Sequence, residues 1–240
     1  MSFEVPQGKE RSEYVRRRFT LTAKKYDLFN DIITLGLHRS WKNFLVEKAH
    51  LKGGRQALDI CCGTGDISQR LSKILGEQGL TVGLDFSEGM LEIAQSRNQG
   101  SDIKFIKGDA LTLPFRSNSF DAVTVGYGLR NLSDINAGLR EVIRVLKPGG
   151  LFLCLDMGKI RIPIIKQLFH LYFFHIVPII GKMIYPGEDL FDYLPKSSVD
   201  YPSQEKLAGK LQDIGFEEVK FFLLFLGGNV IHYAEKPHYG

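Results

Sequence analysis

Short, continuously apolar runs alternate with amphipathic stretches between residues 56 and 156 of the 240-residue chain. The runs read QALDIC, LTVGLD, IKFIKG, FDAVTVG and GLFLCLD. Runs that are apolar throughout are typical of parallel strands that crossover helices bury on both faces. One such helix is expected over 134–146, because the KPGG sequence at 147–150 cannot continue it and predicts a turn.

Helical and strand-like segments flank this core on both sides. Residues 10–50 place apolar and aromatic side chains at helical spacing, and 160–186 and 203–214 indicate further helices. Two strand-like runs, 216–226 and 228–235, finish the chain. We therefore expect one α/β domain over 1–240, built on a doubly wound, mostly parallel seven-stranded sheet with N-terminal and inserted helices. Its parts are a helical lid (10–50), a ligand-binding core (56–156), inserted helices (160–214) and C-terminal strands (216–235).

The composition is that of a globular protein, with 44% hydrophobic and 24% charged residues and a formal net charge of +4. Basic residues gather between Lys9 and Lys25, where a solvated helix face is the simplest interpretation. Beside a site that handles lipids, the same stretch would favour an anionic membrane surface. Nucleic-acid binding is disfavoured, because no stacking motif or basic recognition element accompanies it.

The three cysteines, of which Cys61 and Cys62 are adjacent, do not form a disulfide framework and indicate a reduced, cytosolic protein. No spaced Cys or His cluster predicts a metal site. The N-terminus lacks the apolar segment of a secretory signal. The most lipophilic stretch, 167–181, is expected to be too short to span a bilayer, which takes ~20 apolar residues.

A glycine-containing turn joins the first strand to its helix in the sequence DICCGTGD at 59–66. Gly63, Thr64 and Gly65 would let a ligand approach the backbone closely. About twenty residues on, the second strand ends in Asp85, where a carboxylate can bind both hydroxyls of a ribose. At the end of the third strand, Asp109 can accept from an adenine amino group and the N–H of Ala110 can donate to the ring.

Charge decides which adenosine-containing cofactor suits this turn. A dinucleotide fold calls for a third glycine three residues after Gly65, but Ser68 stands there. Asp66 lies in the first helical turn, where its charge would repel a diphosphate. The ammonium and sulfonium groups of S-adenosylmethionine suit an acidic turn, so this cofactor is expected.

Several further motifs carry a resemblance to a known family. They are YDLFN (26–30), GLHRSWK (36–42), GYGLRN (126–131), RVLKPGG (144–150), and DYLPKS (192–197) followed by YP (201–202). With the glycine turn, they resemble the ubiquinone/menaquinone biosynthesis C-methyltransferases from about residue 14 to 233. The resemblance implies a class I methyltransferase fold and transfer of a methyl group from S-adenosylmethionine to a ring carbon of a prenylated quinol. It places Thr64, Asp85 and the Asp109–Ala110 pair at the cofactor, and Gly126, where the family often has serine, could contact it only through its backbone.

A ring carbon becomes nucleophilic when the neighbouring phenol loses its proton, so the site must position both reactants and assist that loss. The candidates are Asp27 with Asn30 on the lid, Arg130 and Asn131 after the fourth strand, and Asp156 at the end of the fifth. Arg130 could stabilise the developing aryloxide or, equally, form a salt bridge to an acid such as Asp134. Asp27 could instead pin the lid, Tyr127 is expected to pack against substrate or core, and His38 and Trp41 are expected to be structural.

The insertion offers two apolar helical faces, Leu168, Leu171, Tyr172 and His175 on one, and Phe169, Phe173, Ile176 and Ile180 on the other. We expect one face to pack into the core and the other to receive the prenyl tail. Arg161, Lys166 and Lys182 would touch anionic headgroups, which predicts a cytoplasmic protein bound peripherally and transiently to membrane. A homodimer or a quinone-biosynthesis complex would fit such a protein. Benzoquinol and naphthoquinol substrates both remain open, as do another lipophilic acceptor and a non-catalytic, cofactor-binding scaffold.

Overall fold

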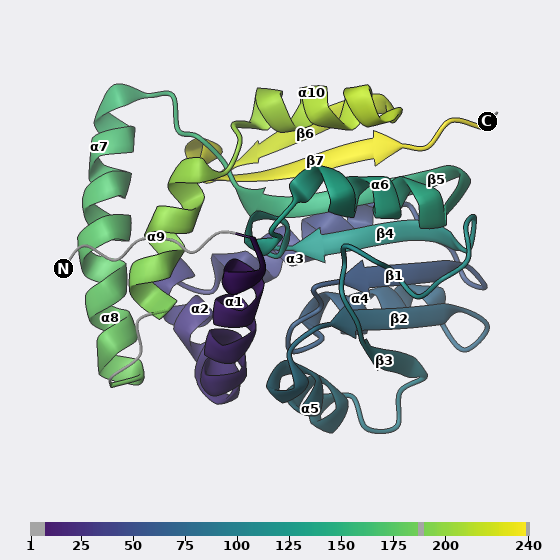
Figure 1. Cartoon of the computed structure of the whole chain (residues 1–240), viewed down its shortest axis with the longest axis horizontal. Coiled ribbons are helices and arrows are strands. Elements are labelled where there is room, and N and C mark those ends of the chain that lie inside the picture. Colours follow the sequence, from purple (N-terminus) through teal and green to yellow (C-terminus); the bar gives the residue numbers. More distant parts are fainter. Residues whose placement is uncertain (1–7, 187–189, 239–240) are drawn as a thin grey trace.

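The computed structural model describes residues 8–186 and 190–238, and a seven-stranded sheet forms its centre (Figure 1). The strand order is β3-β2-β1-β4-β5-β7-β6. Strands β1 to β5 pair in parallel, while β7 is antiparallel to both of its neighbours. The predicted mostly parallel, seven-stranded sheet is confirmed. The strands are β1 (Gln56–Ile60), β2 (Leu80–Asp85), β3 (Ile103–Lys107), β4 (Phe120–Gly126), β5 (Leu146–Met157), β6 (Glu217–Leu224) and β7 (Asn229–Glu235).

Helices cover both faces of this sheet, which is why the inner strands β1, β2 and β4 are mostly apolar and buried. On one face, α6 (Ile135–Val145) and α10 (Gln204–Ile214) bury Leu139 and Leu211 against β1, β4 and β5. On the other, α3 (Leu37–Lys48) and α4 (Asp66–Leu75) bury Leu45 and Leu71. Another helix, α5 (Glu88–Arg97), packs against β3 and β2.

The predicted turn after α6 is a bulge inside strand β5. The helix ends at Val145, close to the expected boundary, but the chain enters the sheet at once. Phe120 of β4 pairs with Leu146 and Ala122 pairs with Leu151, so the KPGG residues form the extra length on β5. Gly149, at φ 72°, allows the backbone to double back there.

A separate layer of helices covers the carboxyl ends of the parallel strands (Figure 1). It contains α1 (Gly8–Thr22), a 3₁₀ turn (Ala23–Lys25), α2 (Tyr26–Thr34), α7 (Pro163–Leu171), α8 (Val177–Ile184) and α9 (Leu190–Asp200). Two more 3₁₀ turns, Leu129–Asn131 and Phe225–Gly227, follow β4 and β6. Phe29, Phe173 and Leu194 join α2, the insertion and α9 in one small apolar core. The lid and the inserted helices therefore pack on each other as well as on the sheet.

A π-helical segment, Tyr172–Ile176, connects α7 to α8 and changes which side chains share a face. Val177 is fully buried, whereas Ile176 is 45% exposed. The predicted helix face that includes Ile176 is therefore wrong at this residue. The three segments form one continuous helix, Pro163–Ile184. Its 22 residues are long and apolar enough to cross a bilayer by length and composition alone, so the length expected for 167–181 does not describe the whole helix.

Candidate active site

The glycine turn after β1 brings backbone groups to the edge of a pocket. Cys61, Gly63 and Gly65 all have positive φ, at 52°, 54° and 81°. A Cβ on Gly65 would lie 3.0 Å from the ring of Phe105 and 3.1 Å from the Asn98 amide, so glycine is needed there for packing as well. The tight turn ends at Gly65, which precedes the first residue of α4.

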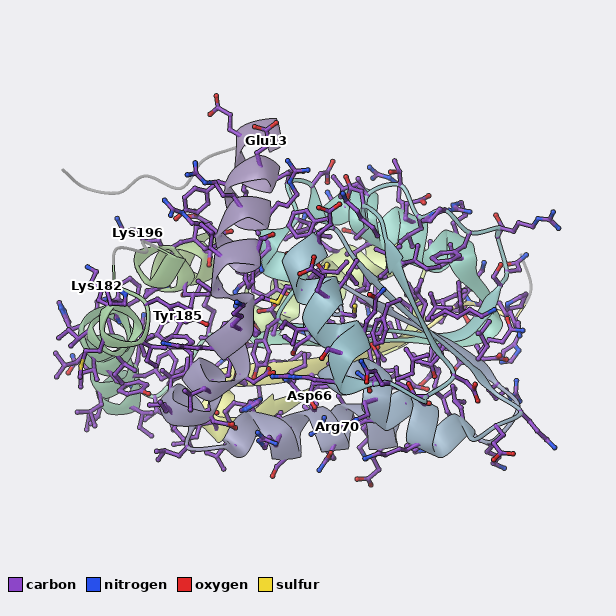
Figure 2. The ribbon with its side chains drawn as sticks, turned by 90° about the horizontal axis from the view of Figure 1, so that it is seen from below. Glu13, Asp66, Arg70, Lys182, Tyr185 and Lys196 are labelled. Carbon is purple, nitrogen blue, oxygen red and sulfur yellow. The ribbon has the colours of Figure 1, made fainter. Side chains whose placement is uncertain are left out.

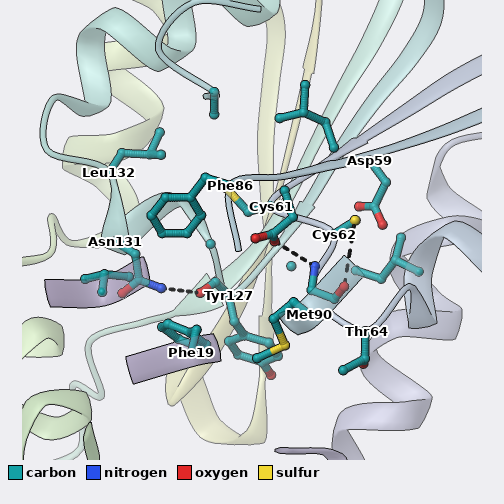
Figure 3. A pocket seen from close by; sticks show the side chains of 18 of the residues that line it. Phe19, Asp59, Cys61, Cys62, Thr64, Phe86, Met90, Tyr127, Asn131 and Leu132 are labelled. Atoms are coloured by element: carbon teal, nitrogen blue, oxygen red, sulfur yellow. Dashed lines mark hydrogen bonds between the residues drawn. The ribbon is translucent and has the colours of Figure 1, made fainter. Parts of the chain in front are cut away.

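The pocket lies between this turn, the ends of β2, β3 and β4, and helices α1, α2 and α3 (Figure 3). Most of the predicted cofactor residues line it, namely Gly63, Thr64, Asp85, Asp109, Ala110 and Gly126. Gly65, the last residue of the turn, is not among the lining residues. Of the predicted catalytic residues, Asn131 lines the pocket, whereas Asp27, Arg130 and Asp156 lie outside its wall.

Asp85 is a buried carboxylate held by the backbone. Its Oδ2 accepts from the N–H of Gly63 at 2.9 Å and its Oδ1 from the N–H of Ser87 at 2.9 Å. Burial raises the pKa of Asp85 to about 6, although these hydrogen bonds oppose the shift. At neutral pH the group is therefore an anion fixed at the end of β2, which suits a pair of ribose hydroxyls.

The Asp109–Ala110 pair lies at the end of the neighbouring strand. Asp85 is paired with Lys107 in the β2–β3 register, and Asp109 follows two residues later. The Oδ1 of Asp109 accepts from the N–H of Leu111 at 2.9 Å, which fixes the carboxylate beside the buried Ala110. The two carboxylates thus occupy adjacent strand ends, as an adenosine requires.

Asp59 is a further pocket carboxylate to which the sequence analysis assigned no role. It is fully buried, and its oxygens accept from the hydroxyls of Ser68 at 2.7 Å and Thr124 at 2.9 Å. Burial raises the pKa of Asp59 to about 6. The sequence signal was a lone acid inside an otherwise apolar strand, which is costly unless partners are provided.

Arg130 forms a buried ion pair with Asp156. The guanidinium lies 2.5 Å from the Asp156 carboxylate, and the backbone N–H of Arg130 donates to the same group at 3.2 Å. Burial opposes the charge, but Asp156 raises the pKa of Arg130. The alternative prediction of a salt bridge between Arg130 and Asp134 is wrong. The Asp134 carboxylate instead accepts from the N–H of Ala137 and caps α6. Two predicted catalytic residues are thus partners of each other.

Asn131 and Asp27 connect the lid helices to the pocket wall. The Asn131 amide donates to the carbonyl of Tyr127 at 3.2 Å (Figure 3). Its oxygen accepts from the hydroxyl of Tyr193 at 3.2 Å. Asp27 accepts from the hydroxyl of Thr64 at 3.1 Å and pairs with Arg97. The structure thus places Asp27 where it pins α2 to the glycine turn, with its oxygens already engaged.

Two pocket residues on α3, His38 and Lys42, were not predicted to be functional. His38 lines the pocket and is 2% exposed, rather than lying in a purely structural cluster. Lys42 lines it as well and donates to Asp66 at 2.8 Å. The thiols of Cys61 and Cys62 are also at this wall, and burial raises their pKa values well above the usual range. They are therefore neutral neighbours of the site.

The lining residues fit S-adenosylmethionine better than a dinucleotide. The described wall carries the carboxylates of Asp59, Asp66, Asp85 and Asp109, which suit hydroxyl donors and cationic groups and would repel a diphosphate. Within residues 8–186 and 190–238, no three or more His, Cys, Asp or Glu side chains are arranged to hold a metal ion.

Solved structures share this fold at low sequence identity. A methyltransferase from Thermotoga maritima, described as S-adenosylmethionine-dependent, matches 92% of this chain and 99% of its own, with a TM-score of 0.67 at 20% identity. A phosphoethanolamine N-methyltransferase from Haemonchus contortus, solved with S-adenosylhomocysteine, matches 82% of this chain and 52% of its own, with a TM-score of 0.62 at 16% identity. The fold is therefore that of class I methyltransferases.

Curated relatives are similar over nearly the whole chain. A demethylmenaquinone methyltransferase of Leptospira interrogans is 44% identical over 98% of this chain and 97% of its own length. One of Desulfitobacterium hafniense is 42% identical over 96% and 92%. The ubiE/COQ5 methyltransferase family matches residues 7–236. The acidic pocket, the glycine turn and these matches agree, and the chain is an S-adenosylmethionine-dependent methyltransferase that belongs to the ubiE/COQ5 methyltransferase family.

Proposed function

We propose that the protein methylates a ring carbon of demethylmenaquinol, a naphthoquinol with a prenyl tail. The observation that carries this proposal is full-length similarity, above 40% identity, to relatives named for that substrate, together with the pocket in which the family's cofactor residues meet. When bound, the cofactor supplies an electrophilic methyl group on its sulfonium. Asp85 and the Asp109–Ala110 pair would hold the adenosine and so fix the direction from which that methyl group is presented.

Two tyrosines of the pocket wall show how burial opposes the ionisation of a phenol. Burial is the main cause that raises the pKa of Tyr26 and the pKa of Tyr127. A quinol hydroxyl buried beside them would therefore need assistance to lose its proton. Arg130 could stabilise an aryloxide only in part, because its charge is already paired with Asp156.

Methyl transfer in vitro tests the substrate. Radiolabelled S-adenosylmethionine is incubated with the protein and either demethylmenaquinol or the corresponding demethylated benzoquinol, each in detergent micelles. Label should appear in the naphthoquinol product and depend on the reduced quinol. Preferential labelling of the benzoquinol would assign the other branch of the family. No labelling of either would contradict the proposed substrate and favour another lipophilic acceptor.

The exposed side of the α7–α8 helix supports peripheral association with a membrane. Its outward apolar side chains are Ile164, Leu168, Leu171, Ile176, Ile179 and Met183. The sequence from 157 to 186 contains basic residues but no acid. Figure 2 shows Lys182 at the end of the molecule away from Asp66 and Arg70 of α4. An apolar stripe with only positive charges beside it matches an anionic lipid surface, where the quinol would be dissolved.

The same helix also reaches toward the pocket. Its buried side packs on α2 through Phe173, Val177 and Phe29, and the Tyr172 hydroxyl donates to the carbonyl of Ile33 at 2.6 Å. Helix α2 in turn supplies Tyr26 and Asn30 to the pocket wall. A substrate with its tail in the bilayer and its ring in the pocket would thus pass along two helices, α2 at the pocket and the α7–α8 helix with its exposed apolar side.

A further inference from the structure

The pocket wall on α3 differs in charge from the rest of the pocket. His38 and Lys42 are four residues apart, so their side chains lie on one face of the helix. Both line the pocket, with 2% and 7% of their surfaces exposed. Among the described lining residues, Lys42 is the only lysine or arginine, in a wall that carries four aspartates. The helix therefore presents one cation to an otherwise acidic cavity.

His38 donates a hydrogen bond from one ring nitrogen, and its other ring nitrogen has no partner among the described residues. Its Nε2 lies 2.9 Å from the Oδ1 of Asp31, and Arg39 donates to both oxygens of that carboxylate at 2.7 Å. A carboxylate only accepts, so Nε2 carries the proton and Nδ1 presents a lone pair. Nδ1 is buried and has no hydrogen-bond partner among the described residues. A buried acceptor without a partner is costly, and a ligand that donates to it would remove that cost.

The Lys42 ammonium shares its hydrogen-bonded carboxylate with a second cation. It donates to Oδ2 of Asp66 at 2.8 Å, but Asp66 also pairs with Arg70, which lies beside it on α4 (Figure 2). One carboxylate thus faces two cations. The ammonium has three N–H groups, and the side chain lies against the first turn of α4, next to the glycine turn.

The order of the strands sets what reaches this wall. Asp109 follows β3, Asp85 ends β2 and the glycine turn follows β1, and these three strands are neighbours in that order. An adenosine held by Asp109 and Asp85 would leave the glycine turn and α3 to line the space for the remainder of the cofactor. That remainder is an amino acid, with an ammonium that donates and a carboxylate that accepts.

We propose that α3 binds the amino-acid end of the cofactor, with Lys42 donating to its carboxylate and Nδ1 of His38 accepting from its ammonium. The inference deepens the proposed site, since it rests on the adenosine lying at Asp85 and Asp109. It assigns a binding role to two residues that the sequence analysis left as structural or unassigned. It also explains why the pocket carries one lysine among its acids.

Truncated ligands separate this role from a general effect on the pocket. S-adenosylhomocysteine has both the adenosine and the amino-acid end, whereas 5′-methylthioadenosine lacks the amino acid. Calorimetric titration of each into wild type and Lys42→Met should show a loss of at least about tenfold for S-adenosylhomocysteine. The affinity for methylthioadenosine should not change. Lys48→Met, a lysine on the same helix that lies over Phe44 outside the pocket, is the matched control.

His38→Gln tests the second contact without removing the first. A glutamine amide can replace the Nε2–H that donates to Asp31, but it removes the Nδ1 lone pair. We expect a selective loss of S-adenosylhomocysteine affinity, again with methylthioadenosine unaffected. Thermal melting of each variant confirms folding.

Three results would overturn the inference. They are unchanged affinity for S-adenosylhomocysteine in Lys42→Met, an equal loss for both ligands, and a His38→Gln protein that binds S-adenosylhomocysteine normally but turns over slowly. The last would make His38 a group that acts on the quinol. A wild type that shows the selective titration pattern but does not methylate demethylmenaquinol would contradict the proposed substrate and leave this assignment standing.

Discussion

At the scale of single residues, the site depends on carboxylates that are ionised although buried. Asp59 and Asp85 lie among apolar strands, and each keeps its charge at neutral pH through two hydrogen bonds from neighbouring groups. Burial nevertheless moves both pKa values to about 6. Such carboxylates bind a cationic or hydroxyl-rich ligand strongly, because little water competes for them. They protonate and bind it less well when the pH falls by two units from neutrality.

This behaviour predicts a pH dependence of cofactor affinity. Asp85 protonates as the pH falls through about 6, and a neutral carboxyl accepts poorly from ribose hydroxyls. The dissociation constant for S-adenosylhomocysteine should therefore rise about tenfold between pH 7 and pH 5. Asp85→Asn should bind about tenfold or more weakly at pH 7 and show little further change, since it cannot titrate.

Calorimetry at several pH values makes this measurement, and a second variant separates the two carboxylates. Asp59 shares the raised pKa, so Asp59→Asn, which retains Asp85, must still lose affinity on acidification. If the affinity of Asp59→Asn did not change with pH, the pH dependence would be due to Asp59 and not to Asp85.

The sequence could locate residues whose position in the sheet is fixed by topology. It could not identify interaction partners that lie far apart in the chain. Asp85 and Asp109 were predictable because parallel strands end at one edge of a sheet, so an acid at a strand end reaches that edge. The Arg130–Asp156 pair joins residues 26 apart on different elements, and spacing gave no reason to prefer Asp156 over Asp134. His38 was expected to be structural, because helical spacing cannot show which side of α3 faces a cavity.

At the scale of elements, the lid is joined to the glycine turn by a small number of polar contacts. Asp27 on α2 accepts from Thr64 in the turn and pairs with Arg97 at the end of α5. The same residue therefore connects three elements that surround the cofactor pocket. We therefore expect ordering of α2 and ordering of the turn to be coupled, because the hydrogen bond between Asp27 and Thr64 requires both.

Removal of this contact should loosen α2 without unfolding the sheet. Asp27→Ala is expected to cost about 1–2 kcal/mol and to speed hydrogen exchange of peptides from 26–34. Exchange in the buried strands β1 and β4 should be unaffected. Bound S-adenosylhomocysteine should slow exchange of α2 in the wild type more than in the variant.

Exchange followed by mass spectrometry makes this comparison, and Lys24→Ala, an exposed change one turn earlier, is the control. Uniform acceleration across all peptides in Asp27→Ala would mean that Asp27 stabilises the whole fold. Unaltered exchange of α2 would show that apolar contacts such as Phe29 hold the lid by themselves.

The sequence predicted the type of most helices and strands, but not which residues pair or share a face within them. The alternation of apolar runs located the strands of the core, since each run had to be buried on both faces. The KPGG sequence was interpreted as a turn, but pairing with β4 keeps it in the sheet as a bulge. The π-helical segment in the insertion moved Val177 into the core in place of Ile176, a shift that a 3.6-residue period cannot reveal.

At the scale of the whole molecule, the helical layer connects the pocket to an exposed apolar helix face. Within this layer, α2 contacts both the pocket and the insertion. Phe169 and Phe173, stacked at 5.3 Å, are on the inner side of that layer. They hold the layer together, and the side chains that remain for a membrane are those on the outer side of α7 and α8.

The last prediction concerns membrane binding by that outer side. Leu168 and Leu171 are 62% and 56% exposed, so Leu168→Ser/Leu171→Ser should fold normally. Burial of a leucine in lipid contributes ~1.5–3 kcal/mol, so loss of both should weaken vesicle binding about a hundredfold or more. Wild type should sediment with anionic vesicles, less so in high salt, while Ile74→Ser/Leu223→Ser, exposed on α4 and β6, should behave like wild type. Equal recovery of all three proteins with vesicles would contradict membrane binding by the outer side of α7 and α8. Wild type that resists extraction by high salt and alkali would show that Pro163–Ile184 inserts across the bilayer instead.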